Sequence, residues 1–287
     1  MLAPRPFWSL LALAGLAAAQ PAPGTAGSRT VLATVSDMRN RAIVDLGVDD
    51  FVVNEGGRAR EVLDVHVADY PIVLLVDNGG AALGDWDAIR KAAARFIARI
   101  GQRPLVLGTI GDPPALLNTF EDDRSVATAR LDALTALTGS DSMVFQAGAA
   151  AAEAVRRSGA PFASIVVISA SATDASRLPA EGLLQAMLDS GAIVHVIARR
   201  EAGTSLGRGA AHNADLLQSL ARRTHGESTT IFSAASYQVA LDRLADRLSS
   251  EVMIQYIVPA DAAAASPGDV KVGVRLPGAR VHGLGVR

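Results

Sequence analysis

Two hydrophobic patterns divide the chain. In its middle, short apolar runs alternate with stretches in which apolar residues recur every three or four positions. Such runs are typical of strands buried on both faces, and the second pattern is typical of amphipathic helices. The predicted strands are 72–76, 105–110, 163–169, 193–198 and 229–232, and the predicted helices are 86–100, 125–137, 145–158, 179–190, 211–223 and 237–250. This alternation predicts an α/β domain over residues 70–251, with a mostly parallel sheet covered by helices on both faces.

The two ends of the chain have a period of two instead. Val31, Ala33 and Val35 alternate with polar neighbours. The same alternation returns at 51–53, 63–67, 252–258, 270–276 and 281–286. Short alternating segments separated by turns predict antiparallel strands and hairpins. Because chain termini usually lie close together, we expect residues 30–69 and 252–287 to pair into one small β-sandwich beside the α/β domain.

The first residues resemble a secretory signal peptide. Arg5 supplies a positive charge, residues 7–16 form a short apolar stretch, and Ala17-Ala18-Ala19 before Gln20 gives a small-residue cleavage pattern. The apolar stretch is well short of the ~20 residues that span a bilayer, which favours a cleaved signal over a membrane anchor. We therefore expect residues 1–19 to be removed and residues 20–29 to form a flexible leader. The mature protein would be periplasmic or secreted, with no transmembrane segment.

Composition narrows the classes of function. The 287 residues carry a net charge of −2 and no cysteine. A near-neutral chain without clustered Lys and Arg excludes a nucleic-acid partner, and the lack of cysteine excludes disulfides and thiolate metal sites. The five histidines lack metal-ligand spacing, and the sequence contains neither a Gly-x-Ser-x-Gly elbow nor a Walker A loop. These patterns give no indication of a catalytic site.

A carboxylate follows the predicted strand 72–76. Asp77 is succeeded by the small-residue loop Asn78-Gly79-Gly80-Ala81. A buried parallel strand that ends in this way places its carboxylate at the C-terminal edge of the sheet, where open α/β sheets bind their ligands. The segment resembles the first motif of von Willebrand factor A (vWA) domains, Asp-x-Ser-x-Ser, which binds Mg²⁺ in the metal-ion-dependent adhesion site. Here Gly79 and Ala81 occupy the two hydroxyl positions.

The other two metal-binding blocks of the vWA family are also incomplete. Ser142 stands where the family has Thr, and Ala170 stands where it has the Asp of a Ser-Asp-Gly motif. Asp77 and Ser142 are therefore the two remaining candidates for metal ligands. Mg²⁺ prefers six oxygen ligands and dehydrates reluctantly, so we expect no metal and no other cofactor. Asp77 is then interpreted as a structural carboxylate that accepts backbone N–H bonds from its loop or caps the next helix.

The resemblance extends over residues 30–287. It rests on a β-rich preamble and a tail strand, represented here by Val44, Leu46, Asp50-Phe51, Glu55, Gly57 and Gln255-Tyr256. These segments resemble bacterial secreted vWA-related proteins. The resemblance implies an exported, non-enzymatic module that binds another protein, or acts as a scaffold, through the loops 77–84, 139–145 and 169–177. The alternative is an exported α/β hydrolase or nucleotide-binding enzyme with its active site at the same sheet edge.

Overall fold

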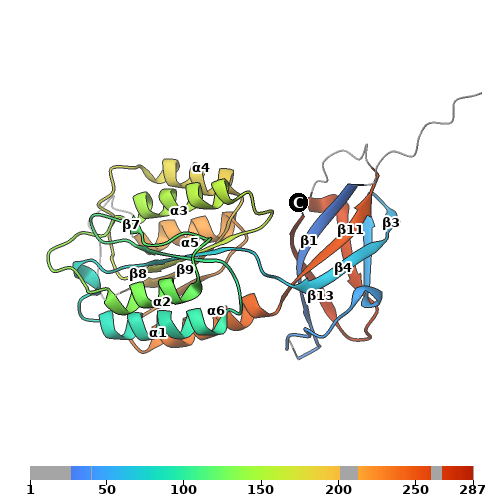
Figure 1. Cartoon of the computed structure of the whole chain (residues 1–287), viewed down its shortest axis with the longest axis horizontal. Helices are drawn as coiled ribbons and strands as arrows, with labels where there is room; N and C mark the ends of the chain where they lie inside the picture. The colour runs from blue at the N-terminus through green and yellow to red at the C-terminus, as the bar shows by residue number, and fades with distance from the viewer. Residues whose placement is uncertain (1–26, 40, 201–212, 260–266, 287) are drawn as a thin grey trace, which may run out of the picture.

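The protein has two lobes, which Figure 1 shows side by side. The computed structural model describes residues 27–39, 41–200, 213–259 and 267–286. One lobe, here the α/β lobe, runs from Ile72 to Ser249. The other, the β lobe, combines segments from both ends of the chain. The predicted signal peptide lies outside the described residues, and no helix within them is long and apolar enough to cross a membrane.

The α/β lobe is built on a six-stranded sheet with the order β10-β9-β8-β5-β6-β7. All neighbours are parallel except the antiparallel pair β6 and β7. The central strand β5 pairs with β6 on one side and with β8 on the other, so that Val76 lies between Thr109 and Ile168. The strands are β5 (Ile72–Val76), β6 (Leu105–Thr109), β7 (Ala115–Leu116), β8 (Ser164–Ser169), β9 (Ile193–Arg199) and β10 (Ser228–Ile231).

Among the described residues, three helices pack on each face of this sheet (Figure 1). One set is α1 (Trp86–Arg99), α2 (Arg124–Ala133) and α6 (Ser236–Ser249), and the other is α3 (Val144–Ser158), α4 (Ala180–Ser190) and α5 (Asn213–Arg223). The central strands are buried on both faces because each face packs on its own helical layer. The predicted doubly covered, mostly parallel sheet is confirmed.

Two local details differ from the sequence predictions. Helix α2 ends at Ala133 and not at residue 137, because the backbone of Leu134 turns to an extended conformation with φ −71° and ψ 144°. The edge strand β7 was not predicted, since two residues are too short to show any periodicity.

The β lobe is a sandwich of two antiparallel sheets, with strand orders β13-β1-β11-β4 and β12-β2-β3. Its strands are β1 (Gly27–Ser36), β2 (Phe51–Glu55), β3 (Arg58–Arg60), β4 (Val62–Val67), β11 (Glu251–Val258), β12 (Val270–Val274) and β13 (Arg280–Val286). Strand β1 pairs with both β11 and β13, and β2 pairs with β12. The two ends of the chain therefore share one core, as predicted. Residues 27–29, predicted as part of the flexible leader, belong instead to β1 and pair with residues 256–258.

The chain crosses between the lobes twice, and a buried polar cluster lies at this junction. The backbone N–H of Ala68 donates to the carbonyl of Glu251. The Tyr70 hydroxyl donates to the Glu251 carboxylate and accepts a hydrogen bond from Ser164. The Arg103 guanidinium lies 4.4 Å from the centre of the Tyr70 ring. Tyr70 at the junction, held by Arg103 and Ser164 of the α/β lobe, therefore fixes the start of β11, where the chain returns to the β lobe.

Burial raises the pKa of Glu251 from its ordinary value of 4.5 to about 7, because it disfavours the charged carboxylate. Tyr70, Arg103 and Arg247 act in the opposite direction, and the negative charge of Glu227 adds to the increase. Since the pKa is higher in the folded state than in the unfolded state, protonation of Glu251 stabilises the folded protein. This contribution to the unfolding free energy is fully present below pH 4.5. It is lost as the pH rises through about 7.

We expect Glu251→Gln to remove this pH dependence, because glutamine keeps the shape and an acceptor for Tyr70 but does not ionise. Relative to the variant, the wild type should lose up to about 3 kcal/mol of unfolding free energy between pH 4.5 and pH 8. Denaturant unfolding at both pH values measures this, with Glu61→Gln at an exposed position as the control. Parallel pH profiles for wild type and Glu251→Gln would contradict the assignment.

Candidate functional site

Asp77 is fully buried at the C-terminal end of β5, and its carboxylate is saturated with hydrogen bonds. Oδ1 accepts from the backbone N–H of Gly79 at 3.1 Å and from the Ser142 hydroxyl at 2.9 Å. Oδ2 accepts from the backbone N–H groups of Ala170 at 2.9 Å and Ser171 at 3.2 Å, and lies 3.1 Å from the same hydroxyl. Three separate loops thus converge on one carboxylate.

The loop after Asp77 packs tightly against its surroundings. A Cβ atom on Gly79 would lie 3.0 Å from the Ser142 hydroxyl and 3.3 Å from Asp77 Oδ1. The next residue, Gly80, donates to the Ser140 carbonyl at 2.7 Å and begins a short 3-10 turn. Ala81 lies in that turn and is exposed. Of the predicted positions, Asp77, Gly79, Ser142 and Ala170 come together, and Ala81 lies at the surface.

Asn78 is a site residue that the sequence analysis did not single out. Its side-chain oxygen accepts from the backbone N–H of Gly111 at 3.0 Å, and its backbone carbonyl accepts from Leu137 at 2.7 Å. A Cβ atom on Gly111 would lie 2.7 Å from the Asn78 oxygen. Asn78 therefore ties the first loop to the loops after β6 and α2. The signal in the sequence was a second polar residue directly after a buried strand.

The third loop, which follows β8, contributes backbone groups alone to Asp77. Asp174, a further carboxylate in this loop, accepts instead from the backbone N–H of Phe145 at 3.2 Å and from Ser176. It therefore caps the start of α3 and does not add a carboxylate beside Asp77.

Three other titratable side chains of the α/β lobe, Asp85, Tyr237 and His195, are partly or fully buried. Asp85 forms an ion pair with Arg199 at 3.1 Å and makes no side-chain capping bond to α1. The buried hydroxyl of Tyr237 on α6 has no hydrogen-bond partner among the described residues, and burial together with the charge of Asp85 raises its pKa. His195 is buried in β9, where desolvation lowers its pKa to about 3 and keeps it neutral. No group of three or more His, Cys, Asp or Glu that could hold a metal occurs in the part of the chain that the structure describes.

The outer surface of the same edge is accessible and carries mainly small residues. Ala81, Gly84, Asp141 and Ala175 are exposed, and Leu83 is 45% exposed. The strands run away from the β lobe, so this edge forms the far end of the α/β lobe in Figure 1. A partner could therefore reach these loops without contacting the β lobe.

No family model and no curated protein sequence match the chain. Among solved structures, the chain is similar to a von Willebrand factor type A protein from Catenulispora acidiphila. The TM-score is 0.54 at 12% identity, covering 83% of this chain and 72% of that chain. It is also similar to proximal thread matrix protein 1 from the mussel byssus. That match has a TM-score of 0.51 at 11% identity and covers 64% of this chain and 48%, about half, of that protein.

At these identities the similarity concerns the fold. The chain has the fold of von Willebrand factor A domains, and the predicted fold class is confirmed. Asp77 follows β5 at the C-terminal edge of the sheet, where the pattern of the strand predicted its carboxylate.

Proposed function

We propose that the protein is an exported module that binds another protein, or acts as a scaffold, through the sheet edge around Asp77 and without a metal ion. The observation that carries the proposal is the hydrogen bonding of Asp77. Three backbone N–H groups and one hydroxyl already donate to its carboxylate. They compensate the negative charge that a cation would otherwise compensate.

A cation at this site would face unfavourable surroundings. Hydrogen-bond donors direct positive hydrogens at the carboxylate, and a metal ion would have to displace them before it could bind. No side-chain oxygen is offered in return by Gly79, Ala81 or Ala170. Mg²⁺ needs near-ideal octahedral geometry and gives up its waters reluctantly. The lost hydrogen bonds would include charge-assisted ones, which are about twice as strong as neutral ones.

The enzyme alternative would need a nucleophile with a base, or a phosphate-binding loop, at the same edge. Ser142 is a buried hydroxyl beside Asp77, and it donates to that carboxylate rather than to a histidine. The sheet edge therefore supports binding better than hydrolysis. Its small exposed residues let a partner's backbone approach closely.

Affinity capture from envelope extract of the native host tests the proposed face. The probes are the wild type, Leu83→Arg at the sheet edge and Leu188→Arg on α4. Both leucines are similarly exposed, at 45% and 40%, and Leu188 lies outside the edge loops. We expect a partner to be captured in EDTA by the wild type and by Leu188→Arg, and to be lost with Leu83→Arg. Capture that requires Mg²⁺, or that Leu83→Arg leaves unchanged, would contradict the proposal.

Export makes a separate prediction. We expect a mature chain that begins near Gln20, since Ala17-Ala18-Ala19 forms the cleavage pattern. Mass spectrometry of the protein isolated from its native host checks this. An intact N-terminus in the membrane fraction would instead identify the first segment as an anchor.

A further inference from the structure

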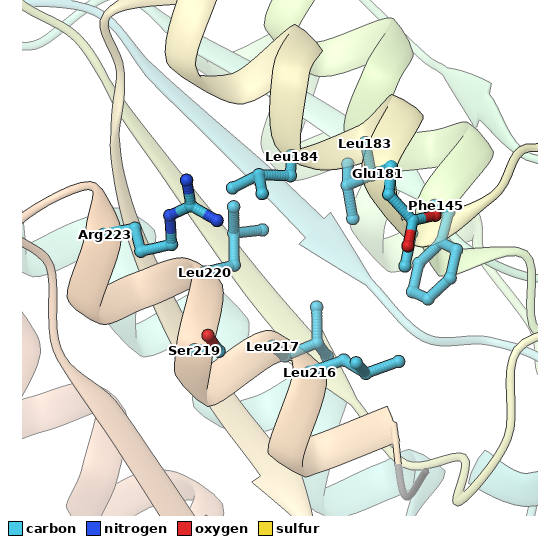
Figure 2. Close-up of a pocket in the computed structure, with 10 residues that line it drawn as sticks. Phe145, Glu181, Leu183, Leu184, Leu216, Leu217, Ser219, Leu220 and Arg223 are labelled. Atoms are coloured by element: carbon cyan, nitrogen blue, oxygen red, sulfur yellow. The ribbon is translucent and has the colours of Figure 1, made fainter. Parts of the chain in front are cut away.

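A second surface of the α/β lobe is an apolar groove between α4 and α5, which we name the α4/α5 groove (Figure 2). The two helices lie on the same face of the sheet, and α4 packs closely on α3 but makes few contacts with α5. The half-buried side chains of Leu184 and Leu216 form its walls. The full lining is Phe145, Ala180, Glu181, Leu183, Leu184, Leu216, Leu217, Ser219, Leu220 and Arg223.

The groove has a volume of about 180 Å³ and a mainly apolar surface. That space is large enough to hold several waters. Waters there find few hydrogen-bond partners, because leucine and phenylalanine side chains line most of the wall. Displacing such waters with apolar groups is favourable. The groove is therefore suited to apolar side chains.

Two opposite charges stand at the rim. Glu181 lies in the first turn of α4, and Arg223 lies in the last turn of α5. Figure 2 shows them at opposite ends of the groove, with Glu181 beside Phe145. Within the described ranges neither side chain forms an ion pair, although the neighbouring Arg200 and Asp215 pair with each other. The groove thus offers a negative charge at one end and a positive charge at the other.

We propose that the α4/α5 groove binds an amphipathic helix of a partner protein. Two helices on one face of a sheet leave a channel along their axes, and a third helix can lay an apolar stripe into such a channel. Helix α5 has 11 residues, which corresponds to a length of about 16 Å, so the groove accommodates two to three turns. The bound helix carries apolar residues at i, i+3 or i+4, and i+7, with an acidic residue near Arg223 and a basic residue near Glu181.

The groove meets the sheet-edge loops at Phe145, but the residues substituted here, Leu184 and Arg223, lie outside those loops. The test uses the full chain and a displayed library of amphipathic helices, randomised on the apolar stripe and at both ends. Helices are selected on the wild type after depletion on Leu184→Glu. We expect enrichment of helices with one acidic and one basic end, and a loss of affinity of at least tenfold in Leu184→Glu and in Arg223→Glu.

Two matched controls separate the groove from general effects of the substitutions. Leu188→Glu makes the same change one turn further along α4, and Arg222→Glu makes it beside Arg223; neither residue lines the groove. Both should bind as the wild type does. Replacing the acidic residue of a selected helix by Lys should restore binding to Arg223→Glu. Circular dichroism melting curves check that all variants fold.

Three outcomes would overturn the proposal. The first is that no helix is enriched after depletion, and the second is that selected helices bind the groove variants and the control variants equally. The third is that a small apolar carboxylate, octanoate, binds with the same dependence on Leu184 and Arg223 while no helix binds. That last result would assign the groove to a small ligand instead.

Discussion

Asp77→Ala is expected to destabilise the protein by about 3–5 kcal/mol in the complete absence of metal ions. The substitution leaves the Ser142 hydroxyl and the backbone N–H groups of Gly79, Ala170 and Ser171 without their acceptor. Each buried donor left unpaired costs about 1–3 kcal/mol, and water entering the space offsets part of that cost. Denaturant unfolding in EDTA measures the change in unfolding free energy.

Two further variants give this prediction its control. Asp141→Ala changes an exposed carboxylate in a neighbouring loop and should alter the unfolding free energy by less than about 0.5 kcal/mol. Asp77→Asn keeps one acceptor oxygen and should lie between the two. If Asp77→Ala were as stable in EDTA as Asp141→Ala, the carboxylate would have no structural role, and a functional role for it would have to be sought.

Glu55→Ala is expected to destabilise the β lobe by about 3–5 kcal/mol. Glu55 ends β2, is 6% exposed and pairs with Arg29 and with Arg60, the latter at 2.9 Å. It also accepts from the Tyr256 hydroxyl at 3.3 Å, and burial and the charge of Glu55 together raise the pKa of Tyr256 to about 12. One carboxylate therefore links β1, β2, β3 and β11. Removing it takes a buried carboxylate away from two largely buried guanidinium groups.

Hydrogen exchange locates the effect of this substitution. Protection should fall in β1, β2 and β11, and the central strands β5 and β8 of the α/β lobe should keep most of theirs. Glu61→Ala makes the same change at an exposed position of the same lobe and serves as the control. Equal exchange in the two variants would mean that the buried ion pairs do not stabilise the sandwich.

The fold could be predicted largely from hydrophobic periodicity, because burial on one or two faces leaves a direct trace in the sequence. The run at residues 72–76 matches β5 residue for residue, since both of its faces are covered by helices. The pairing of the two chain ends was predicted from termini that lie close together, and β1 provides it by pairing with both β11 and β13. The start of β1 at Gly27 was missed, because its first residues carry no alternating pattern.

The site was less predictable, because the backbone makes much of it. Asp77 and Ser142 could be identified from the sequence because their side chains carry oxygen atoms. The backbone N–H groups of Ala170 and Ser171 that donate to Asp77 could not, because their positions depend on the conformation of the loop and not on side chains. The role of Asn78 depends on its side-chain contact with the backbone N–H of Gly111, which lies in a different loop and cannot be read from the sequence. The α4/α5 groove could not be predicted from the sequence. Leu184 and Leu216, which line it, follow the same helical spacing as leucines in the core.

Calorimetric titration of the full chain with Mg²⁺ and Mn²⁺ tests the central claim most directly. We predict no heat beyond dilution up to millimolar concentration, because the Asp77 carboxylate is already occupied by four donors within the protein. The same titration on Asp77→Asn should be indistinguishable from that of the wild type. A sub-millimolar affinity in the wild type that disappears in Asp77→Asn would show a working metal site and would contradict the account.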